Sequence, residues 1–392
     1  MTRAPAPTPV RAAAPPSVKG RCPGAHAPMM AGDGLIVRIR PRSGRLEAGA
    51  VLGLCALAER FGKGAMELTN RANLQIRGVA PEAHEALLLG LEDLGLLDPD
   101  ADVERRRNLI VDPFAPLGGL SHRLAQALTE ALPRLPALPP KIGFAVDAGP
   151  APRLRDASAD LRFETGPGGL ILRADGAAGG RPVTEAQAVP ALIDMAEWLA
   201  ERLSPEARRM AQVQAIRPLP AVWTRATAPR PAPRPSPGPN AIGFMLGAPF
   251  GRLPAKALAT LMRDSGAPAL RLTPWRLFLL EGAAEPPRAS VLSTESPFVA
   301  EDSPLLRAHA CPGAPFCGSA GVETRDLAAR LAPRMEGSLH VSGCAKGCAK
   351  ASPSDVTLVG RDGAFDLVRG GRAGDAPALR GLSPDALLDA FS

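Results

Sequence analysis

Aromatic side chains are scarce in this 392-residue chain, which has no tyrosine, three tryptophans and eleven phenylalanines. Proteins that bind single-stranded nucleic acid stack bases on aromatic rings, so this composition argues against such a surface. Long apolar runs are also missing, since no stretch approaches the roughly 18 apolar residues of a membrane-spanning helix. The segment Met1–Lys19 is rich in Ala and Pro and lacks the continuous apolar stretch of a secretory signal. We therefore expect a cytoplasmic protein without a membrane partner.

The net charge of +7 does not indicate a basic binding face on the folded core. Residues 1–31 contain four basic side chains and no acidic one, and residues 221–240 contain three and none. These two segments account for the whole excess, so the rest of the chain is formally neutral. Without a basic core or stacking aromatics, we expect no nucleic-acid partner.

Proline is concentrated in one internal segment, where it occupies every second position from Pro229 to Pro239. Proline has no N–H donor and a fixed φ, so Thr227–Pro239 is expected to lie outside helices and sheets as an extended linker. The parts of the chain on either side of it repeat each other at an offset of roughly 200 residues. The sequence thus predicts a duplicated protein.

Matched segments carry this repeat. In each half a strand leads into a helix, then into two strands around a Leu-Thr turn with an arginine, then into a short segment ending in proline, and last into a hairpin with a Gly-containing turn. The pairs are Gly34–Arg40 with Ala241–Leu246, the helices Ala48–Phe61 with Pro254–Asp264, Met66–Arg77 with Leu270–Leu280, Arg107–Pro113 with Arg307–Pro312, and Asp160–Gly176 with Asp355–Gly371. A further helix is expected over Thr184–Leu203, with Thr184 as its N-cap. These patterns predict an α/β (α+β) protein with pseudo-twofold symmetry and antiparallel sheets.

The second half carries four cysteines where the first half has none: Cys311, Cys317, Cys344 and Cys348. They form a C-x5-C and a C-x3-C pair in loops rich in Gly and Pro, and an iron–sulfur cluster is held by four such thiolates. Structural zinc sites usually have C-x2-C or C-x4-C pairs, which the x5 and x3 spacings fit poorly. Disulfides are rare in the cytoplasm. The spacing therefore favours a [4Fe–4S] cluster over zinc or disulfides.

The other two cysteines are read differently. Cys55 lies in an apolar helical stretch and is expected to be a core residue. Cys22, in Gly-Arg-Cys-Pro-Gly, is either an ordinary loop thiol or part of an N-terminal arm that reaches into the site.

The duplicated module, with these cysteine pairs in its second half and arginines before its strands, resembles the sirohaem nitrite and sulfite reductase family over nearly the whole chain after residue 20. The resemblance implies two ferredoxin-like half-domains and two cluster-type subdomains, with a tetrapyrrole between the halves and Cys348 as the cluster ligand nearest to it. The segments expected on this basis are a disordered tail (1–20), the first ferredoxin-like half-domain (21–100), the first cluster-type subdomain without cysteines (101–222), the Pro-rich linker (223–239), the second ferredoxin-like half-domain (240–300) and the [4Fe–4S] cluster subdomain (301–392).

Some of the basic residues with which the family binds the tetrapyrrole have a match in this chain, and one does not. Arg71 matches the arginine of the T-x-R-x-x-x-Q strand, Arg107 that of the R-N-[VL] segment, and Arg276 holds the place of Arg71 in the repeat. Bidentate arginines suit the carboxylates of such a ring, although Arg71 and Arg107 can also be read as ordinary arginines at strand ends. Lys141 matches the first lysine of a K-x-K motif, whereas Gly143 replaces the second. This removes a positive charge where reduction of an oxyanion would need one.

Three segments resemble more closely the branch of this family that acts in aerobic cobalamin synthesis: Cys22–Arg38, Lys141–Gly149 and Cys311–Cys317. That resemblance implies a monooxygenase that hydroxylates precorrin-3A at the meso carbon between rings A and D, with an acetate side chain closing a lactone. It also implies O2 and an NADH-linked electron donor, with electrons relayed by the cluster. The alternatives are a sulfite or nitrite reductase, which alone would carry sirohaem, and a non-catalytic electron-transfer protein or tetrapyrrole carrier.

The branch is further credited with a mononuclear non-haem iron, which usually takes two imidazoles and a carboxylate. The chain has only five histidines, and no H-x-D/E pattern marks such a site. His26, in the N-terminal motif, and His309 and His340, shortly before cluster cysteines, are the candidates, while His84 and His122 are expected on helix surfaces. The catalytic residues, the electron donor and the oligomeric state are left open.

Overall fold

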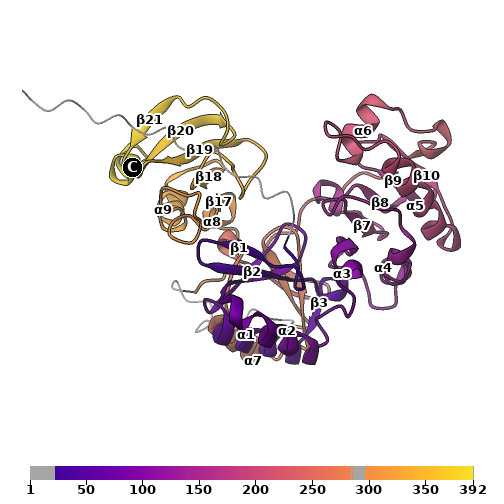
Figure 1. Cartoon of the computed structure of the whole chain (residues 1–392), viewed down its shortest axis with the longest axis horizontal. Helices are drawn as coiled ribbons and strands as arrows, with labels where there is room; N and C mark the ends of the chain where they lie inside the picture. Colours follow the sequence, from indigo (N-terminus) through magenta and orange to yellow (C-terminus); the bar gives the residue numbers. More distant parts are fainter. Residues whose placement is uncertain (1–22, 284, 286–295, 392) are drawn as a thin grey trace, which may run out of the picture. The chain divides into compact units, whose positions relative to one another are not determined.

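The structure is a computed structural model that describes residues 23–283, 285 and 296–391 (Figure 1). The described residues form two compact units, one within 23–302 and the other within 303–391. The expected N-terminal tail and Cys22 lie outside the described residues. The larger unit contains three of the sheets and the smaller unit contains the fourth.

Two five-stranded antiparallel sheets in the larger unit correspond to the two repeats. In spatial order, the first consists of β1 (Met29–Ala31), β2 (Gly34–Ile39), β5 (Leu74–Val79), β4 (Ala65–Leu68) and β14 (Arg252–Pro254), and the second of β12 (Gly238–Asn240), β13 (Gly243–Gly247), β16 (Leu277–Glu281), β15 (Ala269–Leu272) and β3 (Arg45–Glu47). Each sheet therefore ends in a strand from the other half of the chain, with Leu253 opposite Met66 and Leu46 opposite Leu270. The repeat predicts the two sheets but not this exchange of strands.

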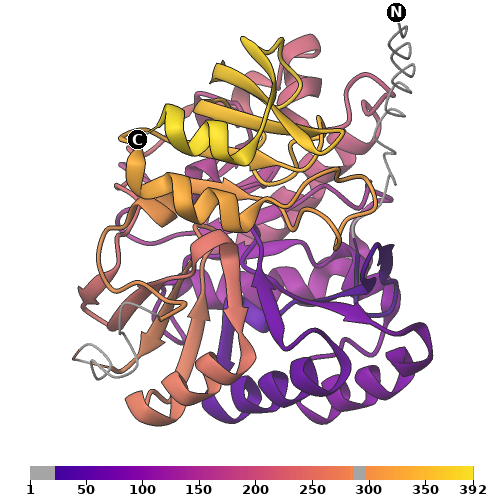
Figure 2. The same ribbon diagram turned by 90° about the vertical axis from the view of Figure 1, so that its left-hand side faces the viewer.

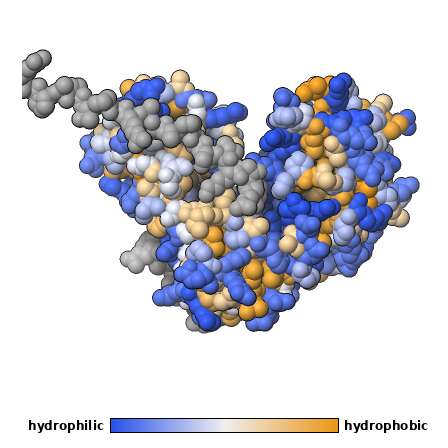
Figure 3. Space-filling model, viewed as in Figure 1, coloured by the Kyte–Doolittle hydropathy of each residue, from blue (hydrophilic) through white to orange (hydrophobic). Residues whose placement is uncertain are grey.

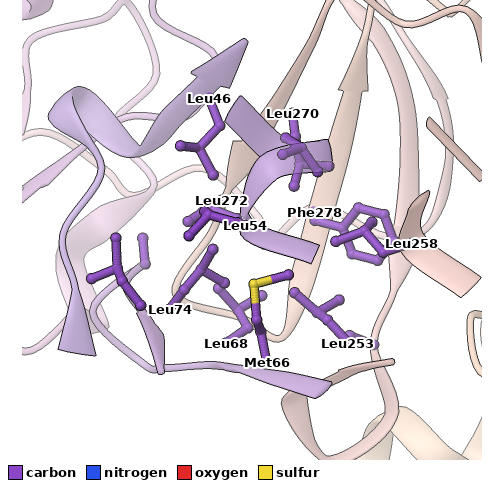
Figure 4. Packing of buried hydrophobic residues seen from close by; sticks show 14 of the residues in the cluster. Leu46, Leu54, Met66, Leu68, Leu74, Leu253, Leu258, Leu270, Leu272 and Phe278 are labelled. Atoms are coloured by element: carbon purple, nitrogen blue, oxygen red, sulfur yellow. The ribbon is translucent and has the colours of Figure 1, made fainter. Parts of the chain in front are cut away.

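Helices α1 (Ala48–Phe61), α2 (His84–Asp93) and α7 (Ala255–Ser265) lie together on one side of these sheets (Figures 1 and 2). The bounds of α1 are those predicted, and α7 is one residue later at each end. Leucines from the strands and from α1 and α7 pack with Met66 and Phe278 into one cluster that draws on both halves (Figure 4). Because burial of this apolar surface drives folding, the two halves share a core and stabilise each other.

A six-stranded sheet forms the cysteine-free subdomain of the larger unit. Its strands in spatial order are β11 (Ala226–Thr227), β10 (Gly179–Pro182), β9 (Gly169–Ala174), β8 (Leu161–Gly166), β7 (Phe144–Asp147) and β6 (Leu109–Val111), and its helices are α3 (Ala101–Arg106), α4 (Leu120–Ala131), α5 (Glu185–Ala200) and α6 (Met210–Ile216). The hairpin β8–β9 and the helix α5 confirm two predictions, and Thr184 caps α5 in a capping box with Gln187. The prediction of antiparallel sheets is wrong here, because β6 pairs with β7 and β7 with β8 in parallel, with α4 crossing over between β6 and β7.

The smaller unit repeats the same strand order. Its sheet runs β17 (Ala308–Ala310), β18 (Leu339–Ser342), β19 (Ser354–Arg361), β20 (Ala364–Gly371) and β21 (Leu379–Leu382), and its helices are α8 (Pro304–Arg307), α9 (Arg325–Leu331) and α10 (Pro384–Ala390). The first two strand pairs are parallel and the last two antiparallel. Helix α9 crosses over between β17 and β18, as α4 does between β6 and β7, so the two cluster-type sheets are structural duplicates.

Both ends of the proline-rich segment pair with sheets, which the sequence did not predict. Thr227 belongs to β11 and Pro239 to β12, and each of these strands lies at the edge of its sheet. An edge strand tolerates proline because only one of its sides must supply ladder hydrogen bonds. Residues 228–237 have no helix or strand, as expected of a linker.

Short 3-10 helices complete the described fold: η1 (Arg42–Gly44), η2 (Pro81–Ala83), η3 (Leu132–Arg134), η4 (Leu154–Asp156), η5 (Ala221–Trp223), η6 (Pro249–Gly251) and η7 (Ala332–Arg334). Apolar side chains reach the surface in separate patches between polar ones (Figure 3). The large exposed apolar residues come from unrelated elements, such as Leu89 of α2 and Leu379 of β21. Among the described helices, none has the length and hydropathy that crossing a bilayer requires.

Candidate metal centre

Two neighbouring loops carry the four cysteines of the smaller unit. Cys311 directly follows β17, and Cys344 comes two residues after β18. Because these strands are parallel neighbours, both loops leave the same edge of the sheet. The pKa of the Cys348 thiol is raised chiefly by its removal from water, against a lowering by Lys346, and further by the three other thiols. The three other thiols therefore act on the thiol of Cys348.

Backbone contacts tie the two cysteine loops together. The Gly343 N–H donates to Cys311 Sγ at 3.2 Å, and the Thr324 hydroxyl donates to the Cys311 carbonyl. Gly343 and Gly313 admit no side chain in this arrangement. A Cβ at Gly343 would lie 2.6 Å from Ala320 Cβ, and one at Gly313 would lie 2.8 Å from Thr324 Oγ1. These two glycines thus let Ala320 and Thr324 pack closely against the cysteine loops.

The donor set fits an iron–sulfur cluster better than a single ion. Four thiolates around one zinc ion would lie roughly 3.8 Å apart, given a Zn–S bond of about 2.3 Å. In the part of the chain that the structure describes, no three His, Cys, Asp or Glu side chains are grouped so that they could hold one metal ion. A cubane cluster is larger, takes one thiolate per iron and accepts N–H groups near its sulfurs. The four cysteines and the Gly343 N–H on Cys311 are the kinds of donor that such a cluster would take.

Two candidate iron ligands, His309 and His340, are paired neighbours on β17 and β18. His340 is 0% exposed, and neither ring nitrogen has a hydrogen-bond partner among the described residues. Burial, with a smaller effect of Lys350, lowers the pKa of His340 to about 4, so its imidazole is neutral at pH 7. The third candidate, His26, belongs to the larger unit, where Nε2 lies 2.6 Å from the Asp98 carbonyl oxygen. A mononuclear iron site at these histidines stays a prediction.

Two of the predicted basic contacts meet in the larger unit. Arg71 is 9% exposed, and its guanidinium donates to the carbonyl of Lys141 at 2.8 Å and to Ser158 Oγ at 3.2 Å. The side chain of Lys141 is exposed. Arg71 is therefore a buried residue that holds the backbone of Lys141, not an ordinary surface arginine at a strand end.

Arg107 and Arg276 have other surroundings in the larger unit. Arg107 is 7% exposed and donates to Asp98 Oδ2 at 2.7 Å and to the carbonyl of Arg40 at 2.8 Å. It also lines a cavity of about 310 Å³ together with Arg42 and His122. Arg276 is half-buried in the turn between β15 and β16, and burial lowers its pKa to about 10, which leaves the guanidinium charged at pH 7.

Comparison with known proteins places this geometry in a family. Residues 27–94 match the nitrite/sulfite reductase ferredoxin-like half domain. A protein from Sinorhizobium sp. named precorrin-3B synthase is 33% identical over 92% of this chain and 84% of its own length. The chain belongs to the precorrin-3B synthase family of nitrite/sulfite reductase-like proteins. A ferredoxin–nitrite reductase from Synechococcus elongatus is 24% identical over 90% of the chain and 84% of its own length.

The fold of the reductases is confirmed separately. The structure of the Mycobacterium tuberculosis NirA protein matches with a TM-score of 0.65 and 19% identity, covering 91% of this chain and 79% of NirA. At that identity the match shows the fold alone. It agrees with the expectation of a duplicated fold that has ferredoxin-like sheets and cluster-type subdomains.

In this member of the precorrin-3B synthase family the turn register corrects one expected equivalence. Leu68 pairs with Leu74 and Leu272 with Phe278, and five residues lie between the partners in each case. Ala72, with φ of 52°, therefore matches Arg276, with φ of 60°, and Arg71 matches Trp275. The sequence motif had matched Arg71 to Arg276 because both are the arginine that follows Leu-Thr.

Sequence reasoning missed two buried carboxylates in the cysteine-free subdomain. Asp112 follows β6 where Cys311 follows β17, so a carboxylate occupies the place of the first cysteine. Asp147 is 1% exposed at the end of β7, and burial raises its pKa to about 7, with Asp112 and Glu164 adding to the effect. Burial likewise raises the pKa of Asp112. The Asp-Pro that replaces Cys-Pro in the repeat was the one available signal.

A third missed residue anchors the N-terminal motif. Glu104 is buried and accepts hydrogen bonds from the N–H groups of Ala25 and His26, at 2.8 and 3.3 Å, and from Arg40. A Cβ at Gly24 would lie 2.9 Å from Glu104 Oε2, so the glycine lets the carboxylate approach. The motif is therefore held by α3, an element whose sequence gives no hint of that role.

Proposed function

We propose that this chain converts precorrin-3A to precorrin-3B in aerobic cobalamin synthesis as an oxygen-dependent oxidoreductase. The observation that carries the proposal is the 33% identity, over 92% of the chain, to a protein named precorrin-3B synthase. The cysteine set and Gly143, in the place of a lysine that reductases use, support it. The fold alone does not discriminate, because nitrite reductases share it.

The proposed reaction consumes O2 and two electrons. One oxygen atom enters the macrocycle as a hydroxyl at the meso carbon between rings A and D, and the carboxylate of an acetate arm adds to the adjacent ring carbon to close a lactone, so the hydroxyl is kept and no further water leaves. The second oxygen atom leaves as water, which takes up two protons and two electrons from an NADH-linked donor. A [4Fe–4S] cluster on Cys311, Cys317, Cys344 and Cys348 would supply electron relay when it is bound.

The basic residues of the larger unit serve the acidic arms of the substrate in this proposal. The exposed Lys141 side chain is a carboxylate contact, and Arg71 positions it by holding its backbone carbonyl. Lys141→Ala should weaken precorrin-3A binding roughly tenfold, the scale of one charged hydrogen bond. Lys256→Ala on α7 removes a lysine whose side chain is 87% exposed and serves as the control. Equal binding by the two variants would remove Lys141 from the proposal.

Labelled oxygen tests the reaction itself. The protein is purified anaerobically and incubated with precorrin-3A, a reductant and 18O2, and the product is analysed by mass spectrometry. We expect a lactone that carries one labelled oxygen atom. A tetrapyrrole recovered without label would leave only binding or electron transfer as the function of the chain.

Iron and sulfide analysis tests the cluster separately. Cys344→Ser should lose cluster absorbance and activity together, whereas Cys55→Ala, which alters a buried thiol of α1, should retain both. Retention of the cluster by Cys344→Ser would overturn the ligand assignment. Four iron atoms per chain indicate the cluster alone, and five indicate an additional mononuclear iron.

A sirohaem-dependent reductase of sulfite or nitrite is the second candidate. It is favoured by the 24% identity to a ferredoxin–nitrite reductase and by Arg71 in its T-x-R-x-x-x-Q strand. The optical spectrum of anaerobically purified protein separates the two candidates. Strong sirohaem Soret and Q bands would support the reductase, and a cluster shoulder without them supports the oxygenase.

A further inference from the structure

His340 is a buried polar side chain that has no hydrogen-bond partner among the described residues. It lies in the middle of β18 at 0% exposure, and both Nδ1 and Nε2 lack a hydrogen-bond partner in the described part of the chain. An unsatisfied buried donor costs roughly 1–3 kcal/mol, so folded proteins seldom keep one without a role. A group that binds next to the ring would supply the missing partner.

The ring of His340 lies under the second cysteine loop. Its neighbours along the strand, Leu339 and Val341, point to the opposite face of the sheet, because side chains alternate. His340 therefore shares a face with Ser342, whose hydroxyl donates to the Cys344 carbonyl at 2.7 Å. The ring atom Cε1 is 3.6 Å from the position that a Cβ on Gly347 would take. Gly347 lies between the ligands Cys344 and Cys348, so the imidazole faces the loop that carries both of them.

The cysteine-free sheet shows which residues occupy the positions of His309 and His340 in the other repeat. In the cysteine-free sheet Leu109 pairs with Phe144, as Ala308 pairs with Leu339 in the smaller unit. One residue further along each strand, Ile110 and Ala145 therefore hold the places of His309 and His340. Both replacements are apolar and buried. Imidazoles occupy these strand positions only in the repeat that has the cysteines, although both repeats build the same sheet.

We propose that His340 is a positioning residue for the cluster, which donates an N–H hydrogen bond to a sulfur of the group held by the cysteine loops. This inference rests on the cluster assigned under the proposed function. A neutral imidazole has one N–H donor. Hydrogen bonds to the sulfurs of an iron–sulfur cluster set its reduction potential. Because the bond is stronger when the cluster carries more negative charge, His340 favours the reduced state and raises the potential.

Two substitutions test the hydrogen bond. His340→Leu keeps an apolar side chain of similar size without a donor, and His340→Asn retains an amide N–H. The full-length variants are purified anaerobically, assayed for iron and sulfide, and titrated for the midpoint potential of the cluster. We expect His340→Leu to reduce the equilibrium constant for one-electron reduction about tenfold, which is 59 mV, and His340→Asn to restore most of it. A fully loaded His340→Leu protein with an unchanged potential would overturn the proposal.

Pulsed EPR can detect the hydrogen bond in the wild-type protein, so this test does not depend on whether a His340 variant folds. The cluster is reduced in protein labelled with 15N-histidine and compared with unlabelled protein. We expect a histidine nitrogen coupling to the cluster that changes with the isotope and disappears in His340→Leu, while His309→Ala retains it. A reduced cluster with no histidine coupling contradicts the proposal. Wild-type protein that binds no iron and sulfide would instead contradict the cluster assignment, and loss of oxygenase activity alone affects neither result.

Discussion

Asp147 combines deep burial with an incomplete set of hydrogen bonds. Its Oδ2 accepts the N–H groups of Arg153 and Leu154, both at 2.6 Å, while Oδ1 has no partner among the described residues. Burial, with the nearby Asp112 and Glu164, raises the pKa of Asp147 to about 7 in the folded protein. The unfolded chain has an ordinary pKa of about 3.9. The folded state therefore binds one more proton between these values, and this group makes the stability fall as pH rises from about 4 to about 7.

Asp147→Asn should remove that dependence. The amide retains an oxygen for the two backbone N–H groups and carries no charge at any pH, so the variant should gain stability relative to wild type between pH 5 and pH 8, by roughly 1–3 kcal/mol. Urea denaturation at both pH values measures the difference. Asp102→Asn, which alters a carboxylate that is 70% exposed, is the control and should show no such change. Parallel pH profiles of wild type and Asp147→Asn would show that the carboxylate is not protonated in the folded protein.

The backbone around Gly143 leaves little room for a side chain. A Cβ there would lie 3.1 Å from the Ser158 carbonyl oxygen and 3.3 Å from that of Asn108, and its N–H donates to Asp160 Oδ2 at 3.0 Å. Gly143→Ala should lower the free energy of unfolding by about 1–3 kcal/mol, because these two carbonyl groups must move to make room for the Cβ. Gly143→Lys should not give the protein sulfite reductase activity. Gly168→Ala is the matched control, since a Cβ at Gly168 meets nothing within 4 Å. Chemical denaturation compares them, and wild-type stability of Gly143→Ala would contradict this account.

At the scale of elements, the exchanged strands β3 and β14 couple the two ferredoxin-like sheets. Leu46 and Leu253 are both buried in the shared core, and Arg45 of β3 donates to Glu281 of β16 at 2.8 Å. Leu46→Ala and Leu253→Ala should each lower the free energy of unfolding by about 2–5 kcal/mol. Each should also reduce the protection of backbone amides from hydrogen exchange in both sheets. Leu379→Ala on β21, at 52% exposure, should leave both sheets unchanged. Loss of protection confined to one sheet in either variant would contradict the coupling.

Local signals in the sequence predict elements well and pairing partners poorly. The apolar pattern of Ala48–Phe61 and the cap at Thr184 lie within the helices that they specify, so both were predicted. Strands β3 and β14 have three residues each and pair with residues more than 180 positions away, and no local pattern records such a partner. The Arg71–Arg276 mismatch has the same origin, because a motif aligns residue types whereas the turn register aligns backbone positions.

For the whole molecule, the sequence predicts the ligands of the centre but not its surroundings. Cysteine is rare enough that C-x5-C and C-x3-C pairs indicate a candidate cluster site from the sequence alone, and this assignment stays a prediction. Asp112 and Asp147 carry no such signal, because an aspartate after a strand is ordinary until its burial is known. The sequence marks His340 only by its nearness to Cys344, and the strand register shows that its counterpart in the cysteine-free sheet is Ala145. Burial and pairing are properties of the folded chain, so these roles could not be predicted.

The duplicated halves cannot be separate domains, because each supplies a strand and core leucines to the sheet of the other. Cutting the chain after Arg234, where residues 228–237 have no helix or strand, interrupts no element of either sheet. We expect fragments 1–234 and 235–392 to lack stable amide protection in β2–β5 and β13–β16 when expressed alone, and to regain it when they are expressed together. Hydrogen exchange and co-purification measure this, and Leu46→Ala in the first fragment should weaken reassembly. Native protection of β13–β16 in the isolated second fragment would contradict the prediction, since that sheet would then be stable without β3 and the first half of the shared core.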